Sequence, residues 1–182
     1  DYEPLPSSTD TGTTTAPGAP PVYDECPDNI SHVTERGNKA ATEAAFARAA
    51  KIIRRRYVVT RVHAQYMEPR GAIGNFDAQE NRLVLYADVQ YPHRVRNMLA
   101  QSIFRVPEGD MRVIAGGVGG GFGSKGWQYV EHRLTVWAAR KLRRPVKWTC
   151  ERSEAVMADE HGRDNIGDIE LALDADNKFI GL

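Results

Sequence analysis

Residues 116–126 read GGVGGGFGSKG, and this glycine-rich stretch decides how the chain is interpreted. A short apolar run at 111–115 predicts a buried strand before it, and a helical pattern follows it. Glycine adopts backbone angles closed to other residues and lets a second molecule approach bare N–H groups. Because a helix N-terminus also carries partial positive charge, the loop favours an anionic or oxyanion-bearing ligand.

Three interpretations of this loop are considered: two nucleotide-binding motifs and a turn without a ligand. A P-loop requires Gly-Lys followed by Ser or Thr, and the order Ser124-Lys125-Gly126 excludes it. A dinucleotide fingerprint matches at Gly121-Phe122-Gly123-x-x-Gly126, with Glu151 ending the next predicted strand. That match is weak because five glycines among residues 117–123 make chance matches easy. A tight turn that binds nothing stays open as the third interpretation.

Composition narrows the function classes. The chain has 182 residues, of which 41% are hydrophobic, and 24 basic residues balance 24 acidic ones. This is typical of soluble globular material without a field directed toward nucleic acid or a membrane surface. No apolar run approaches the roughly 20 residues of a membrane span, and no signal peptide is apparent. Cys26 and Cys150 form no metal-binding cluster, which favours a reducing cytoplasm and leaves a disulfide between them open.

Alternation between apolar periods predicts a mixed α and β chain. The helix after the loop ends before Pro145, and its apolar face is expected to comprise Val130, Leu134, Trp137, Ala138 and Leu142. The other predicted elements are a helix at 39–50, a strand at 52–62, an irregular turn at 67–71, a strand at 83–89, a helix opening at Pro92, a strand at 146–150, and a terminal hairpin from Ile169.

Four further motifs occur in order around the loop. Met67-Glu68-Pro69-Arg70-Gly71 and Gln90-Tyr91-Pro92-His93-Arg94-Val95-Arg96 precede it; Arg144-Pro145-Val146-Lys147-Trp148 and Glu151-Arg152-Ser153-Glu154 follow it. With Gly-Gly-Gly-Phe-Gly-x-Lys at 119–125, they resemble the molybdopterin-binding large subunits of xanthine dehydrogenase, aldehyde oxidase and aerobic carbon monoxide dehydrogenase. The resemblance covers essentially the whole chain. It implies an α+β fold, the first part of a molybdopterin-binding domain, with a mixed sheet and three main helices packed on it.

The resemblance also divides the chain. Residues 1–6 resemble the end of an upstream hammerhead-type domain, residues 7–30 an extended linker, and residues 31–182 the N-terminal part of the molybdopterin-cofactor-binding domain, truncated at its C-terminus. The Ser, Thr, Pro and Gly content of residues 7–21 independently favours a linker. A strand that stops in mid-hairpin at Leu182 leads us to expect a fragment.

Within the family, residues 148–154 and 161–164 look closest to the carbon monoxide dehydrogenase branch. Purine-oxidising members carry a glutamate directly after the loop lysine, and here that position is Gly126. The resemblance therefore argues against a purine substrate.

The resemblance places cofactor contacts at Gln90, Gly121, Phe122 and Gly123. Gln90 matches a glutamine whose amide approaches an oxygen ligand of molybdenum; its alternative role is to cap the helix that opens at Pro92. Phe122 matches a phenylalanine that flanks the metal pocket, or it anchors the loop in the core. Gly121 and Gly123 allow close approach, or serve turn geometry alone. The resemblance places no catalytic residue and no direct metal ligand in this fragment.

The remaining polar residues receive structural interpretations. Lys125 either offsets cofactor or phosphate charge or is a solvated lysine at a helix start. Glu68 and Arg70 are expected to form local pairings that hold their turn, rather than to catalyse. His93 and His161 lack metal-ligand spacing. Asp159 and Glu160 are expected to lie in a polar loop. A packing role is expected for Trp127, Trp137 and Trp148.

The implied whole enzyme is a molybdenum hydroxylase that hydroxylates an aldehyde or heterocycle, or oxidises carbon monoxide, with water as oxygen source. Its cofactor would be molybdenum-molybdopterin, with the cytosine dinucleotide as one form. Iron–sulfur and FAD subunits would be partners in a dimer of heterotrimers. The general-base glutamate, and a copper-binding cysteine in true carbon monoxide dehydrogenases, would lie in later sequence. We therefore expect this fragment alone to be inactive and marginally folded.

Overall fold

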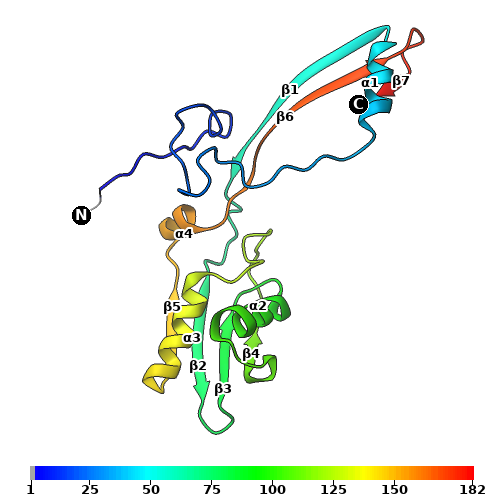
Figure 1. Ribbon diagram of the computed structural model, residues 1–182. Helices are drawn as coiled ribbons and strands as arrows, with labels where there is room; N and C mark the ends of the chain where they lie inside the picture. Colours follow the sequence, from blue (N-terminus) through cyan, green and yellow to red (C-terminus); the bar gives the residue numbers. More distant parts are fainter. Residues whose placement is uncertain (1–2) are drawn as a thin grey trace. The chain divides into compact units, whose positions relative to one another are not determined.

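Residues 3–182 are described by the computed structural model, and they fall into two units. One unit combines the chain up to Arg61 with Arg163–Leu182, and the other is Val62–Gly162 (Figure 1). Helices and two separate sheets confirm the predicted α+β class. The predicted domain boundaries after residues 6 and 30 stay predictions, and Asp1 and Tyr2 lie outside the described residues.

A four-stranded mixed sheet forms the base of the 62–162 unit. Its strands in spatial order are β4 (Met111–Ile114), β3 (Arg82–Ala87), β2 (Gly71–Asp77) and β5 (Val146–Thr149). β2 pairs antiparallel with β3 and β5, and β3 pairs parallel with β4. Strand β2 was missed by the sequence analysis because Gly-Ala-Ile-Gly-Asn-Phe-Asp has two glycines and little β-branched character. Pairing on both edges, rather than propensity, makes it a strand.

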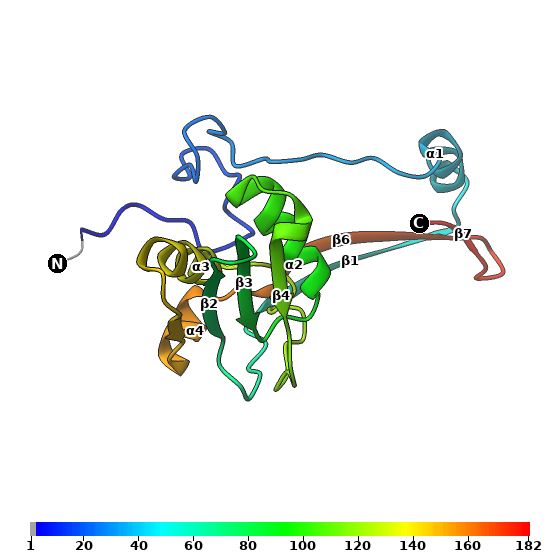
Figure 2. The same cartoon turned by 90° about the horizontal axis from the view of Figure 1, so that it is seen from below.

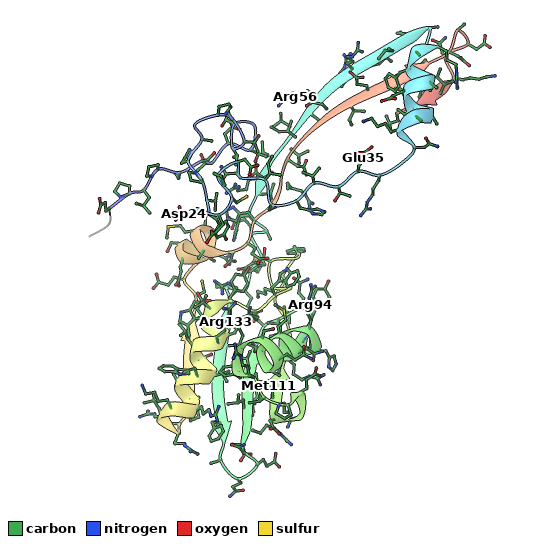
Figure 3. The ribbon with its side chains drawn as sticks, viewed as in Figure 1. Asp24, Glu35, Arg56, Arg94, Met111 and Arg133 are labelled. Atoms are coloured by element: carbon green, nitrogen blue, oxygen red, sulfur yellow. The ribbon has the colours of Figure 1, made fainter. Side chains whose placement is uncertain are left out.

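Helices cover one face of this sheet. They are α2 (Pro92–Met98), its continuation η1 (Leu99–Phe104, a π-helix), the 3₁₀ turn η2 (Glu108–Asp110) and α3 (Val130–Leu142). The remaining helix of this unit, α4 (Arg152–Ala158), follows β5 in the chain. As predicted, α2 opens at Pro92. It lies against β4, while α3 lies against β2, in both views (Figure 1 and Figure 2). The sheet and helices share one core, which buries Leu85, Leu99, Val136 and Met111. Of these residues, Figure 3 labels Met111.

The face of α3 that packs on the sheet differs from the predicted one. Val130, Leu134, Trp137 and Leu142 are 52–58% exposed in this chain. The buried residues of the helix are instead His132, Thr135, Val136 and Ala139. The reason lies in β2, where a Cβ at Gly74 would stand 2.2 Å from the carbonyl oxygen of Thr135. The glycine lets the helix backbone itself approach the strand at Thr135, so the face that contains Thr135 is buried rather than the stripe of large apolar residues.

The other unit is built on a long ribbon. Its elements are α1 (Lys39–Ala47), β1 (Lys51–Val62), β6 (Gly162–Leu173) and β7 (Phe179–Gly181), with strand order β1-β6-β7. Ion pairs Arg54–Glu170 and Arg56–Asp168 join β1 to β6 (Arg56 is labelled in Figure 3). As the residue number rises along β1, the number of its partner on β6 falls, which is the pattern of antiparallel strands. The predicted helix, strand and terminal hairpin are confirmed, the hairpin as antiparallel β6 and β7. Residues 7–30 form turns without helix or strand.

Two predictions from composition concern membrane-spanning segments and the two cysteines. Among residues 3–182, no helix has both the length and the apolar character to cross a membrane. Cys26 and Cys150 are both free, so the disulfide left open above is not formed.

Candidate cofactor-binding site

The glycine loop connects β4 to α3 and has strained backbone at its tip. Gly120 and Gly123 have φ of 94° and 102°, and Phe122 between them has φ of 48°. A non-glycine residue in this region costs on the order of 1–2 kcal/mol and persists only where its surroundings demand it. The Phe122 side chain is 80% exposed, so it does not anchor the loop in the core. The loop therefore presents an aromatic ring at its surface instead of burying it.

Gln90 lies directly against this tip. Its side-chain carbonyl accepts the Gly123 N–H at 3.0 Å, and its backbone N–H donates to the Lys125 carbonyl at 2.9 Å. A Cβ on Gly121 would stand 2.6 Å from Gln90 Oε1, so only glycine fits there without moving the amide. The structure thus brings Gln90, Gly121, Phe122 and Gly123 together, and their contact with a cofactor stays a prediction.

The alternative role for Gln90, capping α2, is not formed. Tyr91 occupies the N-cap position of α2 and makes no side-chain capping hydrogen bond. With its carbonyl committed to Gly123, the Gln90 Nε2 amide has no hydrogen-bond acceptor among residues 3–182. An amide in this state can donate to an oxygen that approaches the loop.

Lys125 fits neither of its two predicted roles. Its side chain is 1% exposed, and its ammonium pairs with Glu68 at 3.0 Å and with Asp88. A solvated lysine is therefore wrong, and so is an ammonium free to meet a cofactor. Glu68 Oε2 also accepts the Gly119 N–H at 2.6 Å. Burial alone raises the pKa of Glu68, but the Gly119 hydrogen bond and the Lys125 charge outweigh it and hold the pKa below its ordinary value.

Arg70 forms a second buried charge cluster behind the loop. Its side chain, also 1% exposed, donates to Asp159 at 2.6 Å and to Glu131 at 3.0 Å. The guanidinium lies 3.7 Å from the centroid of the Tyr129 ring. The local pairings predicted for Glu68 and Arg70 are therefore wrong, because the partners of both side chains come from distant segments. The polar-loop interpretation of Asp159 is wrong because its carboxylate is fully buried.

The remaining predicted residues are spread over the unit. No group of His, Cys, Asp and Glu that could hold a metal occurs among the described residues. Trp148 packs against the core, whereas Trp137 is 52% exposed in this chain, so a packing role is wrong for it here. Arg94, labelled in Figure 3, stacks on Trp127 at 3.4 Å. The His161 ring lies edge-on to the His63 ring with the centroids 5.4 Å apart, and its Nε2 lies 3.1 Å from the Val156 carbonyl oxygen.

Asp88, His132 and Tyr129 were missed by the sequence analysis. Each is a polar residue whose partner is remote or lies on a helix face that was assigned wrongly. Asp88 follows β3 and accepts the Gly71 N–H at 2.9 Å. His132 is 2% exposed on α3, and its Nδ1 accepts the Tyr129 N–H at 3.2 Å. No spacing signal in the sequence marks these contacts.

His132 should make stability depend on pH. Burial, aided by Arg70, lowers the pKa of its ring from 6.5 to about 4. The unfolded chain therefore binds the proton more tightly, so stability is complete above the unfolded pKa and is lost as pH falls towards the folded one. The slope is at most about 1.4 kcal/mol per pH unit. His132→Asn, which keeps a hydrogen-bond acceptor but does not titrate, should lose less melting temperature than the parent between about pH 7.5 and about pH 5. Equal losses in both proteins would contradict this.

Bare N–H groups in a glycine loop, an amide donor at its edge and buried charges behind it are the features of a cofactor-binding domain. The chain belongs to the molybdopterin cofactor-binding domain family, whose pattern matches residues 22–182. This membership counts against the dinucleotide-binding interpretation, and so does the sheet order. β4 and β5 run in the same direction, but β3 and the antiparallel β2 lie between them, whereas a dinucleotide-binding turn and its helix join neighbouring parallel strands. Family membership also counts against a domain that only turns the chain.

Relatives come from several enzymes. The carbon monoxide dehydrogenase large chain of Hydrogenophaga pseudoflava is 36% identical over 146 residues, which cover 80% of this chain and 18% of that one. The 6-hydroxypseudooxynicotine dehydrogenase complex subunit gamma of Paenarthrobacter nicotinovorans is 34% identical over 155 residues, which cover 81% of this chain and 19% of that one. The structure of reconstituted CO dehydrogenase from Oligotropha carboxidovorans superposes with a TM-score of 0.87 at 31% sequence identity. The superposition covers 98% of this chain and 24% of that one. The chain thus spans about a fifth of the length of these relatives.

Proposed function

We propose that this chain is the loop-bearing part of the catalytic subunit of a molybdenum hydroxylase, and that residues 90 and 121–123 form one wall of its active site. The single observation that carries the proposal is the Gln90 amide. Its carbonyl is held by Gly123 at 3.0 Å, which leaves the Nε2 donors directed by the loop and without an acceptor among the described residues. Family membership supports the identity of the ligand.

The residues present fit a molybdopterin cofactor. Gly121 lets the Gln90 side chain pack directly on the loop backbone, and at Gly123 a Cβ would meet nothing within 4 Å, so a bound group can approach the backbone there. The exposed Phe122 ring can cover an apolar side of the pocket and exclude water. When bound, the cofactor would supply the two-electron redox chemistry, with water as the oxygen source. A neutral amide suits the neighbourhood of an oxygen ligand because it donates hydrogen bonds without adding charge.

The substrate we propose is an aldehyde, a heterocycle or carbon monoxide. Gly126 supports the exclusion of purines, because even a Cβ there would stand 3.0 Å from the Gly123 carbonyl and 3.5 Å from the Tyr91 ring. A glutamate at this position would have to move the turn that holds Gly123.

The wider assembly is also a proposal. Relatives are named as subunits of larger enzymes, which supports the existence of partner subunits. That these subunits carry iron–sulfur clusters and FAD, and assemble as a dimer of heterotrimers, rests on the family resemblance alone. The general base, any copper site and the contacts to a cytosine dinucleotide form of the cofactor would lie outside these residues. The chain alone would be inactive, and the cytoplasmic location rests on the cysteine usage of the sequence.

Elemental analysis of the full-length enzyme, purified with its partner subunits, tests the proposal first. We expect molybdenum and iron together, with copper only if carbon monoxide is the substrate. Active enzyme without molybdenum would end the proposal.

Gln90→Glu tests the amide directly. A carboxylate keeps an oxygen for the Gly123 N–H but loses the Nε2 donors, so kcat should fall by about 100-fold or more while molybdenum content stays unchanged. Gln79→Glu is the matched control, because Gln79 is exposed in the turn between β2 and β3. Steady-state kinetics and metal analysis measure both. Full activity of the Gln90→Glu enzyme would show that Gln90 only holds the loop in place and does not contribute a hydrogen-bond donor to the active site.

A further inference from the structure

Lys125 is the most deeply buried cation next to the proposed cofactor wall, and it touches none of that wall's exposed groups. Its side chain is 1% exposed, and both of its partners are carboxylates, Glu68 and Asp88. Burying an ammonium costs several kcal/mol unless paired charges compensate for the lost hydration. A buried charge of this kind is seldom needed for stability, since apolar replacements of similar volume are often as stable. A different role has to account for it.

Glu68 connects this charge to the start of the loop tip. One oxygen, Oε2, accepts both the Lys125 ammonium at 3.0 Å and the Gly119 N–H at 2.6 Å. The Glu68 N–H in turn donates to the Gly119 carbonyl at 3.2 Å. Gly119 is thereby held at both backbone groups, and a Cβ there would stand 2.5 Å from Glu68 Cβ.

Asp88 and the Lys125 backbone connect the same charge to Gln90. Asp88 accepts the Gly71 N–H at 2.9 Å, which fixes it to the start of β2. It lies two residues before Gln90 in the sequence. The Lys125 carbonyl accepts the Gln90 N–H at 2.9 Å. One residue therefore holds the loop through its side chain and Gln90 through its backbone.

We propose that Lys125 is a positioning residue: its buried ammonium, acting through Glu68 and Asp88, holds residues 119–123 and Gln90 in the arrangement that receives the cofactor. The inference rests on the proposed function, because it gives that arrangement its purpose. Lys125 itself does not touch the cofactor, since both carboxylates enclose its ammonium.

The experiment compares Lys125→Met and Glu68→Gln with the parent, in the full-length enzyme with its partner subunits. Methionine fills a similar volume without charge, and Gln at 68 keeps an acceptor for Gly119 but weakens the ion pair. Lys178→Met is the control, since Lys178 is exposed in the terminal hairpin. Hydrogen exchange of peptides across residues 116–126 reports loop order, exchange across β3 reports overall stability, and metal analysis and kinetics complete the set.

We expect loop exchange to quicken about tenfold or more in both variants, with β3 exchange unchanged, and kcat to fall about tenfold with a smaller change in KM. If Lys125→Met does not fold, Glu68→Gln carries the test, because its side chain is 41% exposed and its loss leaves the core intact. Unchanged loop exchange, or loop and β3 exchange rising together, would overturn the inference. Absence of molybdenum from the active parent enzyme would instead overturn the proposed function. The exchange data would still show whether Lys125 orders the loop.

Discussion

Gly74→Ala is expected to destabilise the 62–162 unit by about 3 kcal/mol or more. The added Cβ would stand 2.2 Å from the Thr135 carbonyl oxygen and 2.5 Å from the Val136 nitrogen. Both are backbone atoms of α3, so no side-chain rotation relieves the contact, and the helix has to move away from β2. Lost contact between α3 and the sheet then exposes the core residue Val136.

Hydrogen exchange across β2 and thermal denaturation of the full-length protein measure this effect. Gly109→Ala is the control, since a Cβ at Gly109 has nothing within 4 Å and should change stability little. If the two alanine variants were equally stable, the close packing of α3 on β2 would be wrong.

Arg70→Met is expected to cost about 3–5 kcal/mol, because it leaves buried carboxylates without their cation. Asp159 is fully buried, and Glu131 is 23% exposed, so Asp159 carries most of the penalty. The measurement is again the shift in denaturation of the full-length protein. The stacking of the guanidinium on Tyr129 at 3.7 Å is lost in the same change.

Arg56→Met supplies the comparison. Its pair with Asp168 leaves both side chains at least 59% exposed, and such pairs contribute about 0–1 kcal/mol. A second change, Asp159→Leu on top of Arg70→Met, should recover part of the loss by removing the unpaired charge. Equal effects of Arg70→Met and Arg56→Met would show that burial of the Arg70 cluster is unimportant for stability.

The sequence was most informative where function depends on backbone and local order. The glycine loop and the helix start after Gln90 are each local features with strong residue preferences. The structure brings Gln90 against Gly121 and Gly123. Class, element order and family follow from the same local signals. Strand β2 escaped because it is a strand by pairing rather than by propensity.

Tertiary structure alone decided which polar residues are buried and which face of α3 is covered. Lys125 looks like a surface residue at a helix start until Glu68, 57 residues away, closes over it. Arg70 meets Asp159 across 89 residues of sequence. The apolar period of α3 predicts a buried stripe of large residues, yet the close approach of the helix backbone to Gly74 buries the face that contains Thr135 instead. Local propensity determines elements, whereas burial depends on what distant segments bring to the same place, and no residue's neighbours in sequence carry that information.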